Sequence, residues 1–223
     1  MHQKVLVVAA HPDDEVLGCG GTLARHVADG DTVTVLFLSD GESSRAEFAE
    51  QAIEDRAEAG RLACAELGVN EVHFLGYPDN KLDTVALLDV VNEIEKRCAL
   101  LRPTVVYTHH SGDLNVDHRV AYQATMTAFR PVADSSVKSI NSFEIPSSTE
   151  WNPNHGSLFS PNLFIDIDRF FSKKMKALKF YGAELRDPPH PRSEKVIRAL
   201  ALLRGSQAGI PLAEAFHIVR KIS

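Results

Sequence analysis

The sequence predicts an α/β fold built on a mostly parallel β-sheet with helices on its faces. Three observations predict it. Strand-like apolar runs alternate with helical patterns over the first half of the chain, and this order is typical of parallel strands joined by right-handed crossovers. The first run, residues 5–10, contains no polar residue, as expected for a strand buried on both faces. Polar clusters directly follow two of the runs, and ligands bind at the carboxyl ends of strands in open α/β sheets.

Local signals set the bounds of the expected elements. The first strand ends near His11, because Pro12 lacks an N–H group and cannot extend a central strand. A helix over residues 15–28 follows this strand. Further strands are expected over residues 32–38, 72–75, 104–108, 140–145 and 162–167. Further helices are expected over residues 47–67, 84–101, 117–129, 170–185, 194–204 and 212–221. Most charges of the 47–67 helix are interpreted as a solvated surface. Arg56 and Arg61 can reach the site from this helix, but the surface interpretation is favoured for both.

Length and composition predict one globular domain over residues 1–223, located in the cytoplasm. The chain has 223 residues and 44% hydrophobic content, which is enough for a sizeable core. Its net charge of −6 argues against a nucleic-acid partner. Three widely spaced cysteines without a CxxC pair are typical of reduced thiols in a cytoplasmic protein. We find neither a signal peptide nor an apolar run long enough to span a bilayer.

His11, Asp13, Asp14 and Glu15 form the first polar cluster, directly after the first strand. Crowded carboxylates repel one another, and a divalent cation removes this repulsion because it uses the same groups as ligands. In the alternative interpretation, the acids only cap the following helix, whose N-terminus favours negative charge. Capping does not explain the histidine before the acids, so the pattern favours a metal site.

The second polar cluster, residues 109–119, follows the fourth strand and ends in Asp117, His118 and Arg119. His118 falls in the first turn of the 117–129 helix, and we expect it to face the sheet. Clusters that follow two parallel strands can converge, so we expect the metal site at the carboxyl ends of strands 1 and 4. Three protein ligands with one open position are the arrangement of a catalytic zinc site. Histidine and carboxylate ligands also suit iron, cobalt or manganese.

With these two motifs, the chain resembles the PIG-L/LmbE family of zinc-dependent N-acetyl-sugar deacetylases. The likeness rests on AHPDDE at residues 10–15 and DHR at 117–119, and it extends through YPDN at 77–80 to AEAF at 213–216. The resemblance implies a Rossmann-like three-layer sandwich. It implies one zinc ion per chain, bound by His11, Asp14 and His118. It also implies that Asp13 is the general base and that the substrate is an N-acetyl amino sugar, either small or conjugated.

The implied reaction needs a nucleophile and a proton for the departing amine. Zinc lowers the pKa of its bound water to about 7 and polarises the amide oxygen, and Asp13 takes the proton of that water. Many relatives carry a histidine three residues before the last ligand, where this chain has Asn115. Asparagine can donate a hydrogen bond to an oxyanion but cannot supply a proton. The acid role is therefore missing, or it falls to His110, to His190 or to Asp13 itself.

Five residues are candidates for substrate binding. Asp79 can accept hydrogen bonds from sugar hydroxyls, or it can be an ordinary turn residue. Trp151 can stack on a sugar ring, or it can fill the core. Arg119 and Arg192, together with Arg204, can hold a phosphate of a conjugated substrate, or they can form ordinary surface ion pairs.

Other functions compete with N-deacetylation. The same scaffold can hydrolyse another small amide. A module that only binds a sugar or a nucleotide would not need a base beside two ligands, yet Asp13 is present. Dinucleotide binding is disfavoured because the first turn is acidic and lacks the GxGxxG pattern. The sequence names neither the sugar nor the oligomeric state, although relatives are often homo-oligomers.

Overall fold

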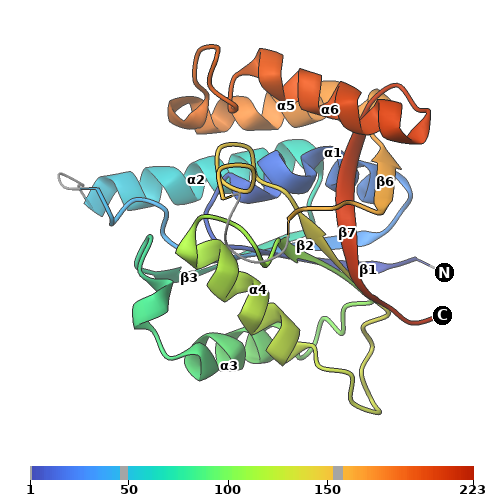
Figure 1. The fold of residues 1–223 in the computed structure, drawn as a ribbon. Helices are drawn as coiled ribbons and strands as arrows, with labels where there is room; N and C mark the ends of the chain where they lie inside the picture. Colours follow the sequence, from blue (N-terminus) through green and yellow to red (C-terminus); the bar gives the residue numbers. More distant parts are fainter. Residues whose placement is uncertain (1, 46–49, 153–157) are drawn as a thin grey trace.

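The computed structural model describes residues 2–45, 50–152 and 158–223. Within these residues, seven strands form one sheet in the order β3-β2-β1-β4-β5-β7-β6 (Figure 1). The strands are β1 (Lys4–Ala9), β2 (Thr32–Ser39), β3 (Glu71–Tyr77), β4 (Val105–His109), β5 (Ser139–Phe143), β6 (Leu163–Asp166) and β7 (Ala213–Lys221). β7 pairs with β5 and with β6 in antiparallel register, and the other pairs of neighbouring strands are parallel. The predicted mostly parallel sheet is confirmed.

Helices cover both faces of the sheet and complete three layers (Figure 1). They are α1 (Asp14–Ala28), α2 (Glu50–Leu67), α3 (Leu87–Cys98), α4 (Val116–Ala128), α5 (Phe171–Leu178) and α6 (Glu194–Ala208). On one face α5 packs against α1 and α2, and on the other face α3 packs against α4. None of the helices in the described ranges has the length and apolar character that a membrane span requires.

The central strand β1 explains the position of the first polar cluster. Its residues Val5 and Val7 face the core beneath α1, whereas Leu6 and Val8 face the core beneath α3 and α4. All four side chains are fully buried, which is why the run contains no polar residue. Since β1 pairs with both β2 and β4, the loop after β1 lies beside the loop after β4.

The predicted helix over residues 212–221 is wrong, because this segment is the strand β7. A short apolar stretch does not by itself distinguish a helix from a strand. Here the tertiary context decides, since β7 forms hydrogen-bonded ladders with β5 on one side and with β6 on the other. The expected 170–185 helix is also shorter than predicted. It ends at Leu178 and continues as the 3₁₀ turn η3 (Lys179–Glu184).

Candidate metal centre and substrate pocket

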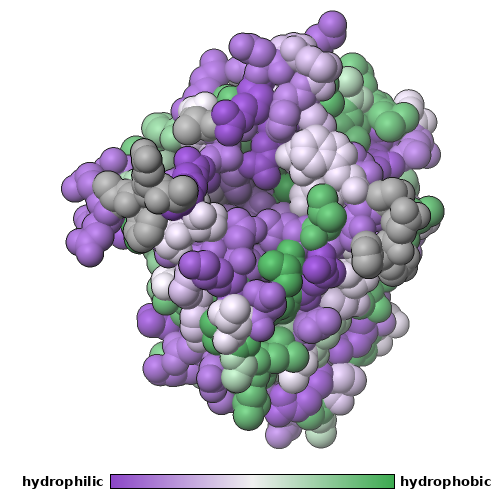
Figure 2. All heavy atoms as spheres, turned by 60° about the vertical axis from the view of Figure 1, so that its left-hand side comes forward, coloured by the Kyte–Doolittle hydropathy of each residue, from purple (hydrophilic) through white to green (hydrophobic). Residues whose placement is uncertain are grey.

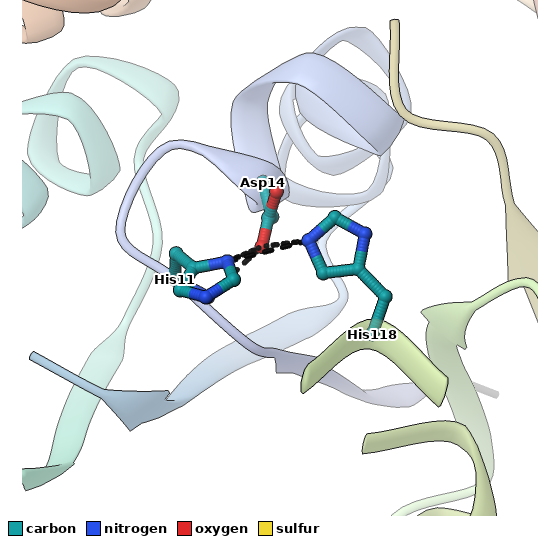
Figure 3. A group of neighbouring side chains, drawn as sticks. All are labelled: His11, Asp14 and His118. Carbon is teal, nitrogen blue, oxygen red and sulfur yellow. Dashed lines mark hydrogen bonds and ion pairs between the residues drawn. The ribbon is translucent and has the colours of Figure 1, made fainter. Parts of the chain in front are cut away.

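Three donor side chains meet at the carboxyl ends of β1 and β4. His11 lies in the loop after β1, Asp14 begins α1, and His118 lies in the first turn of α4. They point toward one another (Figure 3) and are all buried. Asp14 Oδ2 lies 3.2 Å from His11 Nδ1 and 3.3 Å from His118 Nε2, and these two nitrogens are 3.3 Å apart. The structure therefore brings together the three residues expected to bind the metal.

The spacing of these donors, which we call the donor set, fits a divalent metal ion. Tetrahedral zinc with bonds of about 2.1 Å separates its ligand atoms by about 3.4 Å, close to the separations of 3.2 to 3.3 Å found here. Asp14 Oδ1 is buried without a hydrogen-bond partner among the described residues, which is costly unless another group contacts the carboxylate. Two imidazoles and a carboxylate suit several transition metals, so the donor set does not select zinc.

A tight turn after β1 orients the donor set. The backbone N–H of Asp14 donates to the carbonyl of His11 at 3.2 Å, and the N–H of His11 donates to Asp14 Oδ2 at 2.9 Å. Between them, Asp13 adopts a φ of 138°, a backbone region that residues other than glycine rarely enter. This turn places Asp13 directly beside the donor set.

A carboxylate behind each histidine of the donor set fixes which of its ring nitrogens faces the other two donors. Asp113 Oδ1 lies 3.0 Å from His118 Nδ1, and Asp117 Oδ2 lies 3.1 Å from His11 Nε2. Such carboxylate–histidine pairs orient the ligands of metal sites. Burial alone would raise the pKa of Asp113, but His118 and neighbouring hydroxyl groups hold that pKa well below its usual range. We therefore interpret Asp113 and Asp117 as the residues that orient the two rings.

His11 also belongs to a second group, with Asp79 and Asp117, whose spacing could hold a cation. Asp79 Oδ1 lies 3.1 Å from His11 Nε2. However, both oxygens of Asp117 already accept backbone N–H groups, from Asn80 at 2.8 Å and from Leu82 at 2.9 Å. We therefore assign the second group to hydrogen bonding behind His11 and reserve the metal for the first group.

His109 packs against the donor set as a neutral ring. Its centroid lies 4.0 Å from that of His118 in a stacked arrangement, and its Nε2 accepts the N–H of Ala10 at 2.9 Å. Burial, together with the neighbouring His118, lowers the pKa of His109 to about 3. The ring is therefore uncharged at neutral pH and supports the position of His118 by packing.

Asp13 is a buried carboxylate whose position is fixed by two contacts. Its Oδ2 accepts a hydrogen bond from Arg192 Nη1 at 3.0 Å, and its backbone N–H donates to Glu15 Oε2 at 3.0 Å. The hydroxyl of Tyr181 donates to the other oxygen of Glu15 at 2.6 Å. Burial raises the pKa of Asp13 to about 6, although Arg192 opposes this shift. A carboxyl group that titrates near neutrality is suited to accepting and returning a proton.

An open cavity of about 180 Å³ lies beside the donor set. We call it the substrate pocket. It is lined by His11, Asp13, Gly41, Ser44, Arg45, Arg56, Asp79, Asn80, Asn115, Glu184 and Arg192. Figure 2 shows a hollow on this side of the molecule that is bordered mainly by hydrophilic residues. Among the residues proposed from the sequence, Asp13, Asp79, Asn115 and Arg192 face this pocket together with His11.

Asp79 and Asn115 occupy the side of the pocket formed by the loops after β3 and β4. Asp79 accepts a hydrogen bond from the hydroxyl of Ser44. Burial alone would raise the pKa of Asp79, but contacts with His11 and Ser44 lower it to about 2. Asn115 caps α4, since its Oδ1 accepts the N–H of Asp117 at 2.8 Å, and its Nδ2 donates to Asn80 Oδ1 at 2.9 Å. The second N–H of the Asn115 amide donates to no acceptor within the described residues.

The two histidines considered for the acid role lie outside the lining of the pocket. His110 is buried, and its ring meets that of Phe159 edge to face at 5.3 Å. His190 meets Trp151 edge to face at 5.8 Å, and its Nδ1 accepts the N–H of Arg192. Trp151 is 51% exposed, so its ring does not fill the core.

Two of the arginines considered for phosphate binding also lie outside the lining. Arg119 of α4 donates to the carbonyl oxygens of residues 113 and 114 in the loop before this helix. Arg204 forms two hydrogen bonds with the carboxylate of Glu144, at 2.7 and 2.6 Å. Arg192 alone of the three reaches the pocket.

Sequence reasoning missed two charged residues of the lining, Arg45 and Glu184, and favoured a solvated surface position for a third, Arg56. Arg56 is only 8% exposed and is not part of the solvated surface expected for its helix. Glu184 reaches the pocket from η3, and no local motif could have indicated this. The two carboxylates behind the ligands, Asp113 and Asp117, did carry a signal, because both lie in the second polar cluster.

The sequence is similar to a protein family and to curated relatives. The family model of PIG-L, described as GlcNAc-PI de-N-acetylase, matches residues 6–129. An uncharacterised deacetylase of Escherichia coli is 31% identical over 183 residues, which cover 78% of this chain and 88% of that protein.

Solved structures share the fold. The N,N'-diacetylchitobiose deacetylase of Pyrococcus horikoshii superposes with a TM-score of 0.79 at 20% identity, over 97% of this chain and 83% of that chain. The 4-carboxy-2-hydroxymuconate hydratase of Pseudomonas putida superposes with a TM-score of 0.76 at 25% identity, over 100% of this chain and 98% of that chain. Proteins of this fold therefore catalyse at least two classes of reaction. The residues of the site, and not the fold, must indicate which reaction a given chain catalyses.

Proposed function

The chain belongs to the PIG-L family, and from this premise we propose that it removes the acetyl group from an N-acetylated amino sugar or its conjugate. Its homologues include deacetylases. The observation that carries the proposal is the position of Asp13, a buried carboxylate that lies beside the donor set and lines the substrate pocket. A module that only binds a sugar has no need of a base at this position.

We propose one zinc ion per chain, held by His11, Asp14 and His118. The donor spacing and the unpaired oxygen of Asp14 support a divalent transition metal, and zinc is the commonest hydrolytic choice for such ligands. When bound, such an ion lowers the pKa of a water molecule to about 7 and polarises the amide carbonyl. The chain itself supplies the orientation of the ligands, through Asp113 and Asp117.

In the proposed reaction, Asp13 moves the proton. It accepts a proton from the attacking water as the new C–O bond forms, and it returns that proton to the amide nitrogen as the C–N bond breaks. The direct products are acetic acid and the free amine, and the acid then gives its proton to the amine at neutral pH, so the reaction balances without a separate acid. This assignment agrees with the positions of His110 and His190 outside the pocket lining. Arg192 holds the carboxylate of Asp13 in place at 3.0 Å.

The remaining polar side chains of the pocket suit a sugar ring. The carboxylate of Asp79 can accept hydrogen bonds from sugar hydroxyls, and the unused N–H of Asn115 can donate to the developing oxyanion. Arg192 can donate to the substrate from the other side of the pocket. Trp151 lies beyond the lining, where its exposed ring can stack on a further ring of a conjugated substrate.

We also propose a cytoplasmic location for this enzyme. Its three cysteines are free and buried, which suits a reducing compartment. The net charge of −6 makes nucleic acid an unsuitable partner. Assembly into a homo-oligomer stays a prediction, which light scattering on the purified protein can test.

Paired measurement of acetate and amine tests the proposed reaction. We expect the zinc-loaded protein to release both in equal amounts from N-acetylglucosamine or from N,N'-diacetylchitobiose. Asp13→Asn should lower the rate by at least about 100-fold, the usual contribution of a general base, while it still binds the metal. Asp83→Asn is the matched control, because Asp83 is exposed and lies outside the pocket lining.

Addition of water to a carbon–carbon double bond is the second candidate reaction. It is favoured by the likeness to the Pseudomonas putida hydratase, which covers 100% of this chain and 98% of that chain at 25% identity. Product analysis separates the two reactions, because hydration releases no amine. A protein that hydrates an unsaturated carboxylic acid and releases no amine from any acetylated sugar contradicts the proposed N-deacetylase function.

A further inference from the structure

Glu184 lies among the three arginines that line the substrate pocket. Its Oε1 accepts hydrogen bonds from Arg45 Nη2 at 2.8 Å and from Arg56 Nη2 at 2.7 Å. Its Oε2 accepts a hydrogen bond from Arg192 Nη1 at 3.1 Å. The arginines come from the loop after β2, from α2 and from the segment before α6, so one carboxylate joins three distant parts of the chain.

This cluster is largely withdrawn from water. The side chains of Glu184, Arg56 and Arg192 are 12%, 8% and 18% exposed, whereas that of Arg45 is 49% exposed. Burial alone would raise the pKa of Glu184, but Arg56 and Arg192 outweigh it and hold that pKa below its usual range. Glu184 is therefore ionised at neutral pH, and its hydrogen bonds to the guanidinium groups are charge-assisted.

The formal charges of the pocket lining balance. Its three arginines are matched by the carboxylates of Asp13, Asp79 and Glu184. Two of the arginines also contact Glu42, which lies behind the lining. Within the described lining, each guanidinium group thus has a carboxylate partner. An incoming phosphate would find the point where the guanidinium groups converge already occupied by Glu184.

We propose that Glu184 is a specificity-determining residue, which makes the pocket select uncharged acetamido sugars over phosphorylated ones. This inference rests on the proposed function, because it names the substrate class of the same site. A phosphate near these arginines would lie beside the carboxylate of Glu184, and the like charges would repel. Neutral hydroxyls can accept from the guanidinium groups and donate to the carboxylates, so a neutral sugar meets no such repulsion.

The test compares N-acetylglucosamine with N-acetylglucosamine 6-phosphate. For each sugar, amine release gives kcat/KM and calorimetry gives Kd, using zinc-loaded protein. We expect the wild type to prefer the neutral sugar. Glu184→Gln should lower this preference at least about tenfold, equal to about 1.4 kcal/mol, mainly because the phosphorylated sugar binds more tightly. The control Glu144→Gln removes a carboxylate bound to Arg204 outside the pocket and should keep the wild-type preference.

Arg45→Gln is a second variant, which tests the inference even if Glu184→Gln folds poorly. We expect it to fold normally, because Arg45 is half exposed. Loss of this cation should weaken binding of the phosphorylated sugar at least about threefold and leave the neutral sugar less affected. The inference is overturned if the wild type prefers the phosphorylated sugar, or if neither variant changes the preference. Sugars that bind in the expected ranking but release no amine would support the role of Glu184 and contradict the proposed N-deacetylase function.

Discussion

Asp13 shows how a single residue can be held in an unfavourable backbone conformation at a functional site. Its φ of 138° costs about 1 to 3 kcal/mol, and surrounding contacts must offset this cost. The backbone N–H of Asp13 donates to Glu15, which is fixed in turn by the hydroxyl of Tyr181. We therefore interpret Glu15 and Tyr181 as positioning residues for the base.

Substitution of Glu15 tests this positioning role. Glu15→Leu removes the acceptor for the Asp13 N–H, so we expect kcat to fall at least about tenfold, with little change in KM. Glu15→Gln keeps an acceptor oxygen and should retain most of the activity. Zinc content, measured alongside, should stay at the wild-type level in both variants. Equal losses in the two variants, or loss of zinc, would show that Glu15 acts in some other way.

The pH dependence of activity follows from the environment of Asp13. A base must be ionised, so activity should fall as pH drops through the pKa of Asp13. Burial raises this pKa to about 6, and a bound dication lowers it, so the acid limb of kcat/KM should lie at or below about pH 6. Arg192 opposes the upward shift, so Arg192→Gln should move the limb to higher pH. If the acid limb of the Arg192→Gln profile lies at the same pH as that of the wild type, the contact between Arg192 and Asp13 is contradicted.

At the scale of elements, a buried ion pair joins α1, α5 and β7. The helical conformation of α1 is interrupted at Cys19, with a φ of −147°. Just after this break, the N–H groups of Gly21 and Thr22 donate to the carboxylate of Glu214 in β7, at 3.0 and 2.7 Å. Lys174 of α5 donates to the same carboxylate at 2.6 Å. Glu214 thus caps the second part of α1, the helix whose first residue, Asp14, is a proposed metal ligand.

Removal of Glu214 should destabilise the protein strongly. Glu214→Leu leaves the ammonium group of Lys174 buried without its partner, which costs about 3 to 5 kcal/mol. Glu93→Ala, at an exposed pair with Lys96, should change the free energy of unfolding by less than about 1 kcal/mol. Urea unfolding curves measure both changes. Similar small effects in the two variants would contradict the structural importance given to the Glu214 pair.

The strand β7 also marks where prediction of the elements from the sequence failed. The first four strands were predicted near their observed positions, because each is a short apolar run bounded by turn signals. Residues 212–221 contain no such decisive local signal, and their strand conformation depends on pairing with β5 and β6. The early end of α5 at Leu178 likewise depends on packing, since Tyr181 in the following turn is buried against Glu15.

At the scale of the whole molecule, the chain order explains why part of the candidate site was predictable. The donor set comes from loops after β1 and β4, which are adjacent parallel strands, and its residues lie in two compact motifs. Arg56 and Glu184 reach the pocket from α2 and η3, and only the packing of these elements on α1 brings them there. Residues in compact motifs can be predicted from sequence, whereas these two needed the three-dimensional arrangement.

Metal content tests the central claim most directly. We would remove metal from the wild type and from His118→Ala, add zinc, remove the excess, and measure the zinc retained together with amine release from N-acetylglucosamine. The proposed function predicts about one zinc per chain and amine release in the wild type, and loss of both in His118→Ala. A wild type that retains no zinc, or a variant that keeps zinc and activity, would contradict the assignment of the donor set as a catalytic metal centre.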